Sequence, residues 1–162
     1  MRKTFLVVGS ALLLGAMACA ASGGGNASDI CTTLLTDEEV EAHLGAGVRS
    51  RVSDFLDEEQ TSPYCEVTLD DGATLIIGVS EVFDEAGAQE FFTDSLAAAN
   101  AAGTAIELPD VAGGAYYDLS DYNLSFTAGK YVVSLYLSTT TGAEMEALSI
   151  LANLMFDRVT DL

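Results

Sequence analysis

The stretch YCEVTLDDGATLIIGV at residues 64–79 decides the fold class, because it contains two β-strand patterns joined by a turn. Apolar and polar residues alternate over 64–69, and a second, more apolar run covers 73–79. The Asp71-Gly72 pair between the two runs is typical of a β-hairpin. Cys65 lies on the apolar face of the first strand, so we expect its side chain to point into the core.

A second hairpin is predicted in the last third of the chain, where strand patterns at 123–128 and 131–137 flank Gly129-Lys130. A turn-rich connector at 108–115 and a short strand at 116–117 precede it. Because strands joined by hairpins pair antiparallel, the two hairpins indicate an antiparallel sheet. The side chains expected on the buried face of its last strand are Tyr131, Val133, Leu135 and Leu137.

The first predicted helix begins at Thr36, which with Glu39 has the pattern of a capping box. Leu35 and Val40 occupy the positions of a hydrophobic staple, and Gly45 is the expected end of the helix. An acidic loop is expected after it, before the first hairpin, at residues 53–62.

Two longer helices are predicted. One covers 84–102, with Asp84 as N-cap and Gly103 at its end, and the other opens with a second capping box at 141–144 and runs to the end of the chain. Their apolar stripes are Ala88, Phe91, Phe92, Leu96 and Ala99, and Met145, Leu148, Leu151, Ala152, Met155 and Val159. The order of helix, strands, helix, strands, helix predicts a single α+β domain over 30–162, in which helices cover an antiparallel sheet.

The first 18 residues have the organisation of a secretory signal peptide, with Arg2 and Lys3 before an apolar run and small residues at the end. The apolar run is shorter than the roughly 20 residues that a membrane-spanning helix needs. Residues 16–19, Ala-Met-Ala-Cys, resemble the lipobox of bacterial lipoproteins, whose cysteine becomes the first mature residue and carries thioether-linked diacylglycerol. The alternative is an ordinary A-x-A cleavage, after which Cys19 is incidental.

We expect a signal peptide at 1–18 and, at 19–29, a lipidated flexible tether that is rich in glycine. Acyl chains on Cys19, palmitate among them, supply the two signals that stable anchoring requires. The predicted location is therefore the outer face of the cytoplasmic membrane, to which the protein is attached by the lipid on Cys19.

Two cysteines remain, Cys31 and Cys65, and an even remainder in an exported chain suggests a disulfide. A metal site would need further ligands, whereas the chain has one histidine, His43, and no C-x-x-C motif. A catalytic thiol would have to use His43 as its base without any local signature. His43 falls in the last turn of the first helix, where a structural role is expected. We predict no metal and no cofactor.

The charge balance is strongly acidic, with 25 acidic and 6 basic residues in the whole chain. Two of the basic residues precede Cys19, which leaves four basic against 25 acidic residues, or −21, after it. A chain of this charge cannot build the basic face that nucleic acid requires. The acidity is typical of a solvated surface that keeps a protein soluble and monomeric, and the alternative is a site for a cation or a basic partner.

No motif of a hydrolase or a phosphate-binding loop is present, and no pair of carboxylates stands out as acid and base. Asp118, Asp121 and Asn123 gather oxygen ligands in DLSDYN, but the spacing is not that of an EF-hand, so we interpret it as a turn rather than a calcium site. The neighbouring tyrosines could line a contact surface or be half-buried strand residues; they are Tyr116, Tyr117 and Tyr122.

Three segments, CTTLLTDEEVEAHLG, YCEVTLDDGATLIIGV and LPDVAGGAYY, together with the closing hairpin and helix, resemble a family of actinobacterial cell-envelope lipoproteins known only as a domain of unknown function. The resemblance covers nearly the whole chain after residue 30. This chain lacks the tryptophan that such proteins often carry soon after the second cysteine, and Ala112-Gly113-Gly114 departs from their G-x-G-D motif. The resemblance implies a Cys31–Cys65 disulfide and a lipid on Cys19, and it assigns no activity.

The function predicted from these features is that of a non-enzymatic lipoprotein that serves as a binding or interaction module of the cell envelope, with an envelope protein as partner. One alternative is a carrier of a small apolar ligand or lipid, held between sheet and helix. A third is a hydrolase that uses carboxylates.

Overall fold

The computed structural model describes residues 27–55, 62–138 and 144–162, and the hairpin predicted at 64–79 lies within its central sheet. The hairpin consists of β2 (Pro63–Leu69) and β3 (Thr74–Glu81). The other strands are β1 (Val48–Phe55), β4 (Ala105–Leu108), β5 (Ala115–Asp118), β6 (Asn123–Ala128) and β7 (Tyr131–Leu137). The helices are α1 (Ala27–Leu34), α2 (Asp37–Leu44), α3 (Glu85–Ala102) and α4 (Glu144–Thr160).

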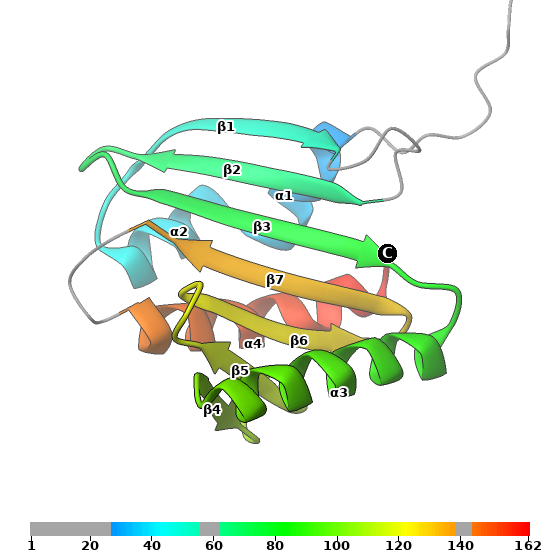
Figure 1. Ribbon diagram of the computed structural model, residues 1–162. Coiled ribbons are helices and arrows are strands. Elements are labelled where there is room, and N and C mark those ends of the chain that lie inside the picture. The colour runs from blue at the N-terminus through cyan, green and yellow to red at the C-terminus, as the bar shows by residue number, and fades with distance from the viewer. Residues whose placement is uncertain (1–26, 56–61, 139–143) are drawn as a thin grey trace, which may run out of the picture.

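All seven strands form one antiparallel sheet in the order β1-β2-β3-β7-β6-β5-β4 (Figure 1). The sheet thus joins two meanders, β1 to β3 and β4 to β7, through the central pairing of β3 with β7. The prediction of an α+β domain with helices over an antiparallel sheet is confirmed.

The helices divide unequally between the two faces of the sheet, with α1, α2 and α4 on one face and α3 on the other (Figure 1). The main core lies under α1, α2 and α4. Four of its completely buried residues are Leu34, Val67, Leu135 and Leu151. A smaller cluster lies under α3, and its members are Phe92, Ala99 and Tyr116, with Leu96 and Ala105 packed against them.

The predicted helix ends are confirmed where they rest on local chemistry. Thr36 and Glu39 form the capping box of α2, and Gly45 ends that helix with a left-handed φ of 73°. The carboxylate of Asp84 accepts a hydrogen bond of 2.8 Å from the backbone N–H of Gly87 and so caps α3. The second capping box begins at 141–143, which lie outside the described residues.

Three elements were not predicted, namely α1, β1 and β4. The loop expected at 53–62 is wrong at its start, because 53–55 belong to β1; residues 56–61 lie outside the described part of the chain. The prediction for Phe91 is also wrong, since this side chain is 58% exposed on the flank of α3 rather than part of its buried stripe.

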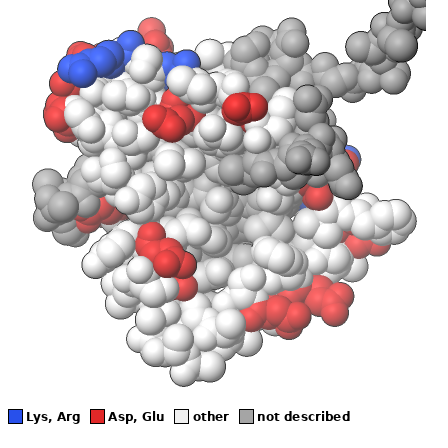
Figure 2. Space-filling model, turned by 45° about the horizontal axis from the view of Figure 1, so that its top comes forward, with Lys and Arg blue, Asp and Glu red and all other residues white. Residues whose placement is uncertain are grey.

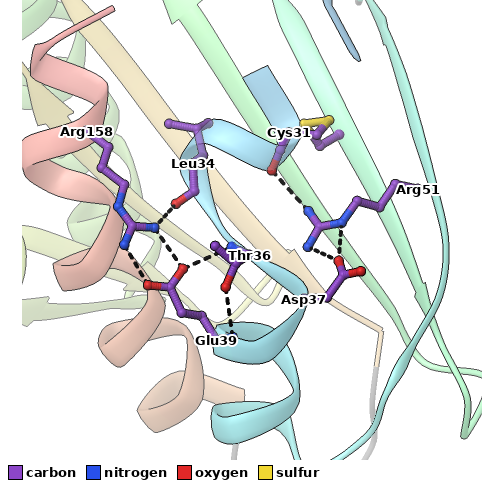
Figure 3. Close-up of polar contacts among 8 residues, drawn as sticks. Cys31, Leu34, Thr36, Asp37, Glu39, Arg51 and Arg158 are labelled. Atoms are coloured by element: carbon purple, nitrogen blue, oxygen red, sulfur yellow. Dashed lines mark hydrogen bonds and ion pairs between the residues drawn. A yellow bond between two sulfur atoms is a disulfide. The ribbon is translucent and has the colours of Figure 1, made fainter. Parts of the chain in front are cut away.

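Helix α1 is held by contacts with distant parts of the chain (Figure 3). For this reason its own residues did not predict a helix. Arg51 of β1 donates a hydrogen bond of 3.0 Å to the carbonyl of Cys31, and Arg158 of α4 donates one of 2.8 Å to the carbonyl of Leu34. The last carbonyls of a helix have no partner within it, so Arg158 satisfies the carbonyl of Leu34. The carbonyl of Cys31 also accepts a backbone hydrogen bond of 3.5 Å from Leu35, which the bond from Arg51 supplements.

Candidate binding face

One half of the sheet carries outward-pointing side chains that none of the described helices covers. Helix α3 packs over β4, β6 and β7, and no other described helix lies on its side of the sheet (Figure 1). We call the outward surface of β1, β2 and β3, together with the part of β7 that α3 leaves uncovered, the open face, and its residues are Val52, Asp54, Tyr64, Glu66, Ile76, Gly78, Ser134 and Tyr136.

The strand register arranges these residues in two rows that run across the sheet. In the first row Val52 lies opposite Glu66, Glu66 opposite Ile76, and Ile76 opposite Tyr136. Neighbouring strands are about 4.8 Å apart, so this row extends for roughly 14 Å. Val52 is 51% and Tyr136 36% exposed, whereas Glu66 and Ile76 are half-buried between them.

The second row contains small residues at the centre of the sheet. Tyr64 lies opposite Gly78, Gly78 opposite Ser134, and Ser134 opposite Ser125 of β6. A glycine inside a central strand weakens the strand and marks a place where another backbone or a ligand approaches closely. The surface is hollowed on this side of the sheet, between the β1–β2 rim and α3 (Figure 2).

The charge of the open face is negative and uncompensated. Each of the four basic residues after Cys19 is ion-paired to a carboxylate: Arg49 to Asp70, Arg51 to Asp37, Lys130 to Glu81 and Arg158 to Glu39. Glu66 is in none of these pairs, so no basic side chain among the described residues neutralises it. Acidic side chains surround the hollow in Figure 2, and basic ones appear only at the edges of that view.

One polar atom beside the open face lacks a hydrogen bond. Asn123 of β6 lies opposite Tyr136, and its Oδ1 is buried without a hydrogen-bond partner in the described structure. Buried polar atoms without a partner are rare, because such an atom costs about 1 to 3 kcal/mol. The first row therefore ends, next to Tyr136, at a buried acceptor without a hydrogen bond, which ordinary sheet packing rarely contains.

The two predicted body cysteines are brought together, which confirms the disulfide. Cys31 of α1 and Cys65 of β2 are bonded to each other, with a Cα–Cα distance of 5.5 Å, and both are buried. The hydroxyl of Ser53 donates a hydrogen bond of 2.7 Å to the sulfur of Cys31. Neither sulfur is a thiol, so this pair offers no nucleophile. Cys19, the predicted lipid site, lies outside the described residues.

The sequence DLSDYN forms the turn between β5 and β6. Oδ1 of Asp118 accepts hydrogen bonds from the backbone N–H of Ser120, at 2.8 Å, and from its hydroxyl, at 2.7 Å. These bonds hold the pKa of Asp118 below its usual value. Within the described ranges there is no group of three or more His, Cys, Asp and Glu side chains that could hold a metal ion.

The tyrosines next to this turn divide between core and surface. Tyr116 and Tyr117 are 7% and 3% exposed, and the ring of Tyr116 packs against Phe92 of α3 with 5.3 Å between ring centroids. Tyr122 is 57% exposed and has a left-handed φ of 54°. Of these three tyrosines only Tyr122 is thus available for contact. His43 is exposed in the last turn of α2.

Sequence reasoning missed the open face because every second residue of a strand is expected to face solvent. A signal was nevertheless present, since the alternate positions of β2, β3 and β7 include Tyr64, Ile76 and Tyr136 rather than only charged residues. Apolar residues at the positions of three neighbouring strands that are expected to face solvent indicate a second contact surface.

Comparison with known proteins does not add an identity: no family model, no curated protein and no solved structure matches this chain. The resemblance to envelope lipoproteins therefore stays a prediction. None of the described helices is both long and apolar enough to cross a membrane.

Proposed function

We propose that this protein is an exported lipoprotein, held at the outer face of the cytoplasmic membrane by the lipid on Cys19, that binds another component of the cell envelope through the open face. The observation that supports the binding role is the open face itself. Val52 and Tyr136 are 51% and 36% exposed there and no described helix covers them, whereas the main core lies on the opposite face of the sheet. Exposed apolar surface rimmed by polar residues is typical of an interaction site.

The distance between the lipid on Cys19 and the first helix of the domain is short. Helix α1 begins at Ala27, within the segment 19–29 that the sequence analysis assigns to the tether. The eight residue-to-residue steps from Cys19 to Ala27 span at most about 28 Å when extended. A lipid on Cys19 therefore keeps the domain close to the bilayer, where membrane and envelope proteins are its neighbours.

The carrier function has less support. The layer between the sheet and helices α1, α2 and α4 is where such a ligand would lie, and large side chains fill it. Leu75, Phe126, Leu148 and Met155 are among those that are completely buried there. The surface site is thus the better supported one, and it needs no catalytic group.

Two measurements test the proposal. Intact mass of the membrane-extracted protein reports cleavage before Cys19 and the added lipid, and Cys19→Ala should release the protein from membranes. Photo-cross-linking with p-benzoylphenylalanine at Val52, on the open face, should give a reproducible adduct in native membranes. Ile150, 37% exposed on α4 at the opposite side of the sheet, is the matched control. Equal labelling from both positions would contradict the assignment of the face.

A further inference from the structure

We propose that the open face recognises a positively charged, extended segment of a partner protein, and that Glu66 binds a lysine or arginine of that segment. This inference rests on the proposed binding function and specifies the chemistry of the partner. It is carried by two features of the open face: an uncompensated carboxylate and apolar neighbours on the same row.

The carboxylate is the first feature. Glu66 is half-buried in the middle of the row, next to Val52 on β1 and Ile76 on β3. A carboxylate in partly apolar surroundings is destabilising unless a cation or hydrogen-bond donors face it. All four basic side chains after Cys19 are already paired elsewhere, so the described part of the chain supplies no such cation.

The charge of the rest of the protein strengthens the same preference. The chain after the leader carries −21, and Asp54 is exposed on the open face one row away from Glu66. A field of this sign attracts basic segments and repels acidic ones, which favours both the rate and the specificity of association. Nucleic acids and anionic lipid headgroups are disfavoured for the same reason.

The neighbouring residues fit the remainder of a basic side chain. Lysine and arginine have long aliphatic stems that pack on apolar surface while the charged end reaches a carboxylate. Ile76 adjoins Glu66 and Tyr136 adjoins Ile76, so stem and cation have partners along one row, and the tyrosine ring can also face a cation. In the adjacent row Gly78 is buried and Ser134 is half-buried, so we expect the contact along the first row.

The test uses the full chain in membranes of its source, with the photo-cross-linker at Val52. Adduct yield is compared between the protein with Glu66, the variant Glu66→Gln and the control variant Glu146→Gln, whose position is exposed on α4. We expect Glu66→Gln to lower the yield by about fivefold or more. Glu146→Gln should leave the yield unchanged. Raising the salt concentration from about 0.05 to 0.5 M should weaken the adduct in the unmodified protein.

Mass spectrometry of the adduct completes the test, because it identifies the segment that lies against β1. A segment with lysine or arginine within a few residues of the linkage supports the inference. An adduct that is insensitive to Glu66→Gln, or that maps to a segment without basic residues, to lipid or to glycan, would overturn the inference and leave the binding function in place. If no adduct forms from Val52 above the level at Ile150, the proposed function fails as well.

Discussion

Replacement of Glu39 by glutamine tests the ion pair that joins α2 to α4. Arg158 donates two hydrogen bonds to this carboxylate, Nη1 to Oε2 at 2.8 Å and Nη2 to Oε1 at 2.6 Å. The backbone N–H of Thr36 donates a third, of 2.9 Å, to Oε2. Together, with the arginine as the largest cause, they lower the pKa of Glu39 from 4.5 to about 2.

The pKa shift gives the magnitude. A shift of this size corresponds to at most about 3.4 kcal/mol, at 1.36 kcal/mol for each pKa unit. The side chains of Glu39 and Arg158 are 24% and 34% exposed, so solvent screens part of the interaction. Since glutamine keeps an acceptor for the backbone N–H of Thr36, we expect Glu39→Gln to lower the free energy of unfolding by about 2 kcal/mol at pH 7.

The pH dependence separates this charge effect from a packing effect. A carboxylate whose pKa is lowered in the folded state stabilises the protein above its unfolded pKa, and the contribution is lost as the pH falls from about 4.5 towards 2. Urea unfolding of the disulfide-bonded protein at pH 7, 5, 3.5 and 2.5 should therefore show the gap between Glu39→Gln and wild type narrowing below about pH 4.5. A gap that stays constant over this range would refute the reasoning. Glu38→Gln, at an exposed position of the same helix, should shift stability by less than about 0.5 kcal/mol.

Three further predictions concern other parts of the fold. Replacing Cys31 and Cys65 together by alanine should cost about 3 to 4 kcal/mol, because the bridge closes a 34-residue separation; unchanged chemical denaturation would contradict this estimate. Asp84→Ala should destabilise the protein by about 1 kcal/mol through loss of the cap at Gly87, and Asp84→Ser should restore most of it in the same assay. Raising NaCl from about 20 to 200 mM should raise the melting temperature, since salt screens the repulsion within a body of charge −21; a flat response would mean that the acidic groups are already screened.

The parts of this fold that could be predicted are those that neighbouring residues determine. The capping box of Thr36 and Glu39, the cap of Asp84 and the Asp-Gly turn of the first hairpin all act over a few residues, and each lies where the pattern placed it. The disulfide was predicted as well, because two cysteines remain once Cys19 is assigned to the lipid.

The elements that were missed depend on contacts that are distant in sequence. Helix α1 has eight residues, too few for an isolated helix in water, and it forms against the disulfide and the two arginines from β1 and α4. Strand β1 is at the edge of the sheet, where charged residues such as Arg49 and Asp54 are favoured over the apolar alternation that marks a buried strand. Its pattern therefore resembled a loop.

Phe91 shows the same limit on a single helix. The periodicity of α3 places Phe91 next to Phe92, and either could belong to an apolar stripe. Helical geometry alone does not tell how wide a stripe the sheet covers. Here Phe92 packs on Tyr116, whereas Phe91 stays on the flank and is 58% exposed.

The open face follows from the connectivity of the sheet. Strands β3 and β4 are separated by β7, β6 and β5, and four successive antiparallel pairings make β3 and β4 parallel, so α3 is the crossover that joins them. Four strand spacings are about 19 Å, and an 18-residue helix is about 27 Å long, so α3 can span those strands obliquely. Because the crossover starts at β3 and runs towards β4, it leads away from β1 and β2. None of the described helices therefore covers the apolar residues on that half, Ile76 among them, and the partner protein that we propose would cover them.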